Sequence, residues 1–170
     1  MSEDQKLPSD ALRLKDIVEL TALVIAEVFG EGRLGGCFHA RYADGTVLLP
    51  KLIAGQPNQE KLEKYIEFAT KEKPERLLRH PKHILSWQSR NPSLGRWGGA
   101  INLSRGTQSG VVLAFSGFPE MVDEAYCMAI GVQMGWVSES GALEIMKISS
   151  NADLFPKVNY VVKETMTPFG

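Results

Sequence analysis

The chain has 170 residues, 44% of them hydrophobic and 23% charged, which is typical of one globular domain with its own core. Nineteen basic and 20 acidic residues give a net charge of -1, so we expect no nucleic-acid partner. The first ten residues are polar and no apolar run approaches the length of a membrane span, so we expect neither secretion nor membrane insertion. The two cysteines do not form the pattern of a disulfide-bonded protein, which suits a reducing cytoplasm.

The first half of the chain predicts a helix, a hairpin and a second helix. Residues 1–11 are polar and charged, and we expect a flexible lead. Apolar residues recur at helical spacing over 15–29, which predicts a helix with one buried face. Asp44-Gly45 lies between two apolar runs and predicts a β-hairpin. Residues 58–73 have an amphipathic helical pattern, and Pro74 either ends it or begins a second short helix.

The second half predicts strands followed by a helix. We expect strands at 83–88 and 97–103, and the glycine pair in the second predicts a bulge or a close backbone approach. Residues 111–115 form the most strongly β-forming run, which we expect at the sheet centre. Pro119 is expected at the first position of a helix. Between them, Gly117 is expected to hold a backbone conformation closed to other residues.

These elements predict an α+β domain, with helices packed on a central antiparallel sheet in the order α-β-β-α-β-β-β-α. We place the domain at 12–140 and regard 141–170 as a C-terminal extension with one short helix. Helices on one face would leave the other face or an edge open, and the extension is more apolar than a solvated tail. We therefore expect the chain to form homo-oligomers.

Two familiar patterns of metal and catalytic sites are weak in this sequence. Cys37 and His39 share a strand face and would join His80 and His83 at a metal, but C-x-H and H-x-x-H match no closed zinc spacing. Ser116 lies at a strand-to-helix turn, but the flanking positions lack the glycines of a nucleophile elbow. We interpret Ser116 as a cap for the following helix and assign no metal ligand and no catalytic residue.

Basic residues concentrate between positions 71 and 82, a segment that contains five cations and two carboxylates. The five are Lys71, Lys73, Arg76, Arg79 and Lys82. We interpret this segment as a solvated helix and turn.

The loops around the glycine-rich strand have the chemistry of an anion site. Guanidinium groups pair with carboxylates or phosphates through two hydrogen bonds, a helix begins nearby, and a tryptophan offers a flat apolar wall. A loop so rich in glycine and arginine is costly to order unless it is used. The predicted ligand-binding residues are Arg90, Arg96, Trp97, Gly98, Gly99, Arg105, Ser116 and Gly117.

Residues 98–103 followed by 111–125 resemble the GlcG/HbpS-like family of haem-binding and haem-degrading proteins. In both, a glycine pair opens a strand, and a strand ending in Ser-Gly leads through a Pro/Glu turn into Asp-Glu-Ala at the start of a helix. The element order over 12–138 is also similar. The resemblance implies this fold, homo-oligomers and haem as a ligand to test. Our chain departs from the family in the 71–83 segment, and its first helix lacks the histidine with which some relatives ligate haem.

We therefore expect a non-catalytic domain that binds a small anionic or planar ligand, haem among the candidates, and forms homo-oligomers. One alternative is an enzyme of haem-linked or other small-molecule chemistry that uses His39, His80 or His83. Another is a protein-interaction or scaffold module. The sequence identifies neither the ligand nor a reaction.

Overall fold

One antiparallel sheet of four strands, in the order β2-β1-β4-β3, lies at the centre of the computed structural model, which describes residues 8–103 and 110–167. The strands are β1 (Gly35–Tyr42), β2 (Val47–Gly55), β3 (Ala100–Asn102) and β4 (Val111–Ser116). Helices pack on this sheet, so the expected α+β class is confirmed. The described residues form four strands where the sequence predicted five.

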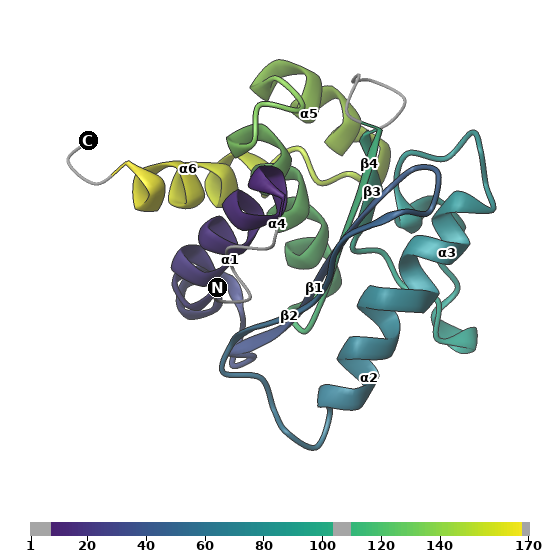
Figure 1. Cartoon of the computed structure of the whole chain (residues 1–170), viewed down its shortest axis with the longest axis horizontal. Helices are drawn as coiled ribbons and strands as arrows, with labels where there is room; N and C mark the ends of the chain where they lie inside the picture. Colours follow the sequence, from purple (N-terminus) through teal and green to yellow (C-terminus); the bar gives the residue numbers. More distant parts are fainter. Residues whose placement is uncertain (1–7, 104–109, 168–170) are drawn as a thin grey trace.

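Helices cover both faces of the sheet (Figure 1). They are α1 (Ser9–Phe29), α2 (Leu62–Glu67), α3 (Lys73–Leu78), α4 (Glu120–Gln133), α5 (Glu139–Met146) and α6 (Phe155–Met166). Helices α1 and α4 contact one face with α5 and α6 outside them, while α2 and α3 contact the other. The expectation of one open face is therefore wrong. No helix in the described parts of the chain is long and apolar enough to cross a membrane.

The sheet confirms the two strongest strand predictions. Every residue of β4 is buried, and β4 pairs with β1 on one side and β3 on the other, so it lies in the sheet interior as expected. The hairpin between β1 and β2 turns at Asp44-Gly45, where Asp44 Oδ1 accepts the Thr46 N–H at 2.8 Å. Strand β2 is an edge strand, a position that tolerates Pro50 because its missing N–H costs no central hydrogen bond.

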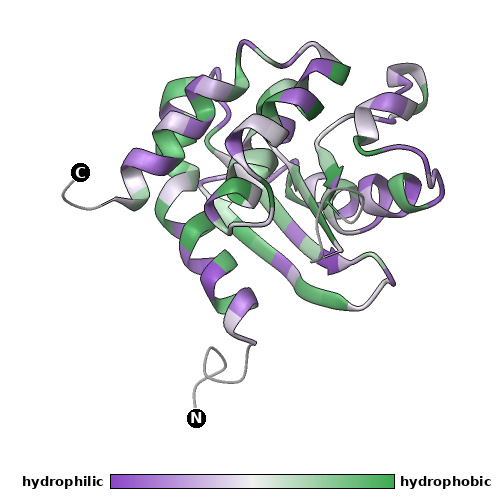
Figure 2. Ribbon diagram, turned by 90° about the horizontal axis from the view of Figure 1, so that it is seen from above, coloured by the Kyte–Doolittle hydropathy of each residue, from purple (hydrophilic) through white to green (hydrophobic). Residues whose placement is uncertain are grey.

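The second helical region bends but does not stop. Helices α2 and α3 are joined by the π-helix η2 (Phe68–Glu72), and Pro74 lies in the first turn of α3, where a missing N–H costs little. Lys73 and Arg76 are only 2% and 1% exposed, so the interpretation of the basic segment as a solvated surface is wrong for these two residues. Figure 2 shows hydrophobic and hydrophilic residues alternating along the helices, as expected for helices that pack on a sheet.

The expected strand at 83–88 is instead a bridge at Leu85 followed by the 3₁₀-helix Ser86–Ser89. Side chains replace the strand ladder here: Gln88 Oε1 accepts the N–H groups of Ile84 and Leu85, and Ser86 Oγ accepts that of Ala100. Because these local bonds satisfy the backbone, the segment turns before it can pair along its length.

Both ends of the domain extend further than expected. Helix α1 begins at Ser9, and its residues Ala11 and Leu14 are fully buried. The segment after 140 forms most of α5 and all of α6, whose residues Phe155 and Val158 lie in the same core as α1 and α4. The expectation of one short helix there is therefore wrong.

Candidate ligand site

A cavity of about 410 Å³ opens between α2, the β4–α4 turn and the segment before β3, a size typical of small-molecule sites. Its walls combine cations, aromatic rings and the start of α4. The described residues that line it are Arg33, Lys61, Lys64, Tyr65, Phe68, Lys73, Trp97, Ser116, Gly117, Phe118, Pro119, Glu120 and Asp123.

One wall comes from a single helical face. Lys61 is three and four residues before Lys64 and Tyr65, and these are four and three residues before Phe68. The helical turns of α2 and the start of η2 therefore bring all four to the same side. Arg33 reaches the cavity from the loop between α1 and β1, and its Nη1 donates to the Phe118 carbonyl at 3.2 Å. None of the ion pairs among the described residues involves these three cations.

The floor is the turn from β4 into α4, which depends on Gly117. This residue has φ +148°, a value that side chains rarely adopt, so the expected special conformation is present. A Cβ here would lie 2.4 Å from the Gly35 carbonyl oxygen and 2.5 Å from the Cα of Gly36. The glycines bring the start of β1 against the turn, which is how Arg33 comes to lie beside the cavity.

A buried ion pair lies beneath this floor. Lys73 Nζ donates to the Phe115 carbonyl at 2.8 Å and to Asp123 Oδ2 at 3.3 Å, while Asp123 Oδ1 accepts the Phe118 N–H at 2.9 Å. Burial raises the pKa of Asp123 to about 7, although the Lys73 ammonium and the Phe118 N–H favour its charged form. The pair fixes α3 to the turn. No side chain caps α4 at Pro119, so the expectation that Ser116 caps this helix is wrong. Asp123 instead accepts the N–H of Phe118, which lies just before the helix.

Arg90 and Gly98 bind a carboxylate of the protein itself. Glu120 accepts the Gly98 N–H through Oε2 at 2.5 Å and two guanidinium bonds from Arg90 at 2.8 and 2.9 Å. The Arg90 guanidinium also lies over the Trp97 ring, 5.8 Å from its centroid. Arg90 and Gly98, which we expected to bind a ligand, are thus bonded to Glu120 of the protein itself.

The other predicted residues separate into two groups. Trp97, Ser116 and Gly117 line the cavity, whereas Arg96 is exposed outside it and Arg105 lies outside the described residues.

Gly99 confirms the predicted close backbone approach. A Cβ on it would lie 2.6 Å from Lys73 Nζ and 2.9 Å from the Phe115 carbonyl oxygen. Its φ of +118° also requires glycine.

Sequence reasoning missed the cations and aromatics of α2 and the loop arginine Arg33. A signal was present, because Lys61, Lys64 and Phe68 recur at helical spacing and combine charge with an aromatic ring on one face. Nothing local in the sequence places Arg33 opposite that face, since this depends on how β1 pairs with β4.

The histidines do not fit an imidazole-ligated haem in this cavity, because none is among its lining residues. His39 is 2% exposed, its Nδ1 is hydrogen-bonded to the Pro50 carbonyl at 2.7 Å, and its Nε2 accepts from Arg41 Nε at 2.8 Å. Burial, with the Arg41 charge, lowers the pKa of His39 to about 4, so the ring is neutral at pH 7. His80 and His83 stack on each other at 4.6 Å.

No cluster of three or more metal-ligating side chains occurs within 8–103 and 110–167. In comparisons with known proteins, no family model, curated protein or solved structure matches the chain. Its function must therefore be argued from the geometry of the cavity.

Proposed function

We propose that this protein is a non-catalytic domain that binds a small planar anion in the cavity between α2 and the β4–α4 turn. The observation that carries the proposal is the composition of the walls. Three cations that form no ion pair with the described residues, Arg33, Lys61 and Lys64, lie around a cavity lined by aromatic rings. The cations favour an anion, and the rings favour a flat partner.

The protein's own carboxylates leave room for this anion. Glu120 is held by Arg90 and Gly98, and Asp123 is held by Lys73, so neither neutralises the cations of α2. A ligand carboxylate or phosphate would therefore meet uncompensated positive charge at one side of the cavity. Its ring would rest against Trp97, over whose ring the Arg90 guanidinium also lies.

Two wider expectations remain part of the proposal. The motif residues support kinship with the GlcG/HbpS-like family, although no histidine lines the cavity to bind a haem iron.

Self-association is supported by exposed apolar side chains on α1, where Leu20 is 59% and Val28 58% exposed. Sedimentation velocity tests it: a dimer at micromolar concentration that Leu20→Glu dissociates would support it, and a strict monomer would overturn it.

The binding test is a titration with 2-naphthoate, flavin mononucleotide and haemin, followed by the quenching of tryptophan fluorescence. Lys61→Gln and Lys64→Gln should each weaken binding of the first two probes by about three- to tenfold through loss of a charge contact. Lys71→Gln is the matched control, since Lys71 is 65% exposed in the same helical region and outside the cavity. Trp97→Phe should remove most of the quenching.

Saturable binding that depends on Lys61 and Lys64 but not on Lys71 would support the proposal. Absence of saturable binding by any of the three probes, or equal effects of all three lysine changes, would overturn it. A sharp Soret band that shifts on His39→Ala or His83→Ala would favour the haem alternative instead.

A further inference from the structure

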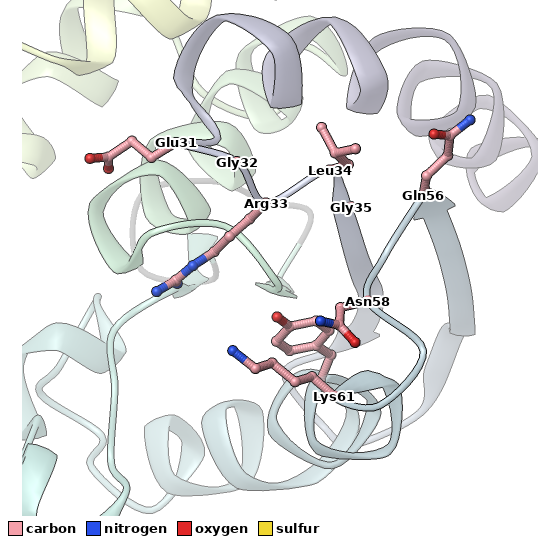
Figure 3. Close-up of a pocket in the computed structure, with 9 residues that line it drawn as sticks. Glu31, Gly32, Arg33, Leu34, Gly35, Gln56, Asn58 and Lys61 are labelled. Carbon is pink, nitrogen blue, oxygen red and sulfur yellow. The ribbon is translucent and has the colours of Figure 1, made fainter.

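A second cavity of about 360 Å³ adjoins the first and shares three of its residues, Arg33, Lys61 and Tyr65 (Figure 3). Its remaining described lining is largely polar or backbone. These residues are Glu31, Gly32, Leu34, Gly35, Gln56 and Asn58. The shared residues make the two cavities neighbouring parts of one groove.

The two cations lie at the junction of the two parts. Arg33 comes from the loop between α1 and β1 and Lys61 from the start of α2, and in Figure 3 both side chains extend toward the same side of the pocket. On one side of this junction are the rings of Phe68 and Trp97, and on the other is the carboxamide of Asn58. The order along the groove is thus aromatic, cationic and polar, with Glu31 as the one carboxylate among the described residues that line the second cavity.

This order suits a ligand whose negative charge lies between two uncharged groups. Resting on the proposed function, we infer that the ligand is a phosphodiester or diphosphate with a planar ring at one end and a hydroxyl-bearing group at the other. The ring occupies the first cavity, the phosphate lies between Arg33 and Lys61, and the hydroxyl-bearing group occupies the second cavity. A ligand that ends at its anion would leave the second cavity to solvent.

Asn58 is the side chain best suited to bind the hydroxyl-bearing group of such a ligand. Its Oδ1 accepts the Glu60 N–H at 2.9 Å, which fixes the turn before α2, and its Nδ2 has no hydrogen-bond partner among the described residues. An amide N–H₂ in this position can donate to a sugar hydroxyl without adding charge. The turn thus orients a neutral donor in the second cavity.

The experiment compares AMP with ADP-ribose by isothermal titration calorimetry at pH 8. Both carry about two negative charges there, since the second pKa of a phosphate monoester is near 6, so a difference in affinity reports the extension beyond the first phosphate. ADP-ribose should bind about tenfold more tightly than AMP, about one decade for each 1.4 kcal/mol of added contact.

Asn58→Ser is the decisive variant, because a serine hydroxyl can accept the same Glu60 N–H and preserve the turn while the amide is lost. It should reduce the affinity for ADP-ribose by about fivefold or more and leave that for AMP unchanged. Gln59→Ser is the control, since Gln59 is exposed on the same turn and outside both cavities. Equal melting temperatures would show that both variants fold.

Equal affinities for the two nucleotides, or an Asn58→Ser effect shared by AMP, would overturn the inference and leave the proposed function standing. Binding of 2-naphthoate or flavin mononucleotide without either adenine compound would do the same. If no planar anion binds, both the inference and the proposed function fail.

Discussion

Replacing Glu124 by glutamine should make the protein more stable at alkaline pH. Glu124 is 1% exposed on α4, and its Oε2 accepts from Ser149 Oγ at 2.5 Å and from Asn151 Nδ2 at 2.8 Å. Its Oε1 is buried with no hydrogen-bond partner among the described residues. These bonds hold the segment between α5 and α6 onto α4. A glutamine keeps an oxygen for both donors and carries no charge.

The size of the effect follows from the pKa. Burial raises the pKa of Glu124 from 4.5 to about 7, although the bonds from Ser149 and Asn151 favour its ionised form. The folded chain therefore binds more protons than the unfolded chain between these values, so stability falls as pH rises. At about 1.4 kcal/mol for each pH unit the full loss is about 3 kcal/mol, and about 2 kcal/mol of it falls between pH 5.5 and 8.

Urea unfolding at pH 5.5 and pH 8 measures this directly. The difference in unfolding free energy between Glu124→Gln and the unchanged protein should shift by about 2 kcal/mol in favour of the variant as pH rises. Glu144→Gln is the control, because Glu144 is 70% exposed on α5. A difference that stays constant with pH, or equals that of the control, would refute the reasoning.

Two further predictions concern backbone geometry and acid stability. Gly117→Val should lower the free energy of unfolding by about 3 kcal/mol or more and the Tm by about 10 °C, because its Cβ would meet the Gly35 carbonyl. Gly45→Val is the control: its Cβ would meet open space, so its Tm should fall clearly less, and equal Tm changes would contradict this. The lowered pKa of His39 means that the folded chain binds fewer protons than the unfolded chain between pH about 4 and 6.5, so this group loses stability as pH falls. His39→Gln should remove about 2 kcal/mol of that loss between pH 7.5 and 5, measured by urea unfolding, and an unchanged acid dependence would exclude this role.

Local sequence determined the parts of the fold whose physics is local. Asp44-Gly45 supplies the positive φ of a hairpin turn, and residues 111–115 have no polar position and so belong inside a sheet. Pro119 marks the start of α4, although it lies at the N-cap, one residue before the expected first helical position. The special conformation of Gly117 was predictable for the same reason, since a strand and a proline-started helix meet there.

Only the tertiary structure decided which charged residues are buried and which line the cavity. Lys73 and Arg76 have the same residue types as their exposed neighbours. Lys73 depends on the distant Asp123, and Arg76 adds the carbonyls of Ser86 and Trp97 to its local ion pair with Glu72. A buried charge is tolerated only where such partners satisfy it.

The site was half predictable for the same physical reason. Trp97, Ser116 and Gly117 follow from a loop and a turn that the sequence displays, and all three line the cavity. Glu120 lies beside Arg90, and Arg33 lies across the cavity from α2, only because the fold brings four segments that are distant in sequence together. Sequence periodicity determines which face of each element is buried, whereas the pairing of the elements decides which charges meet across the cavity.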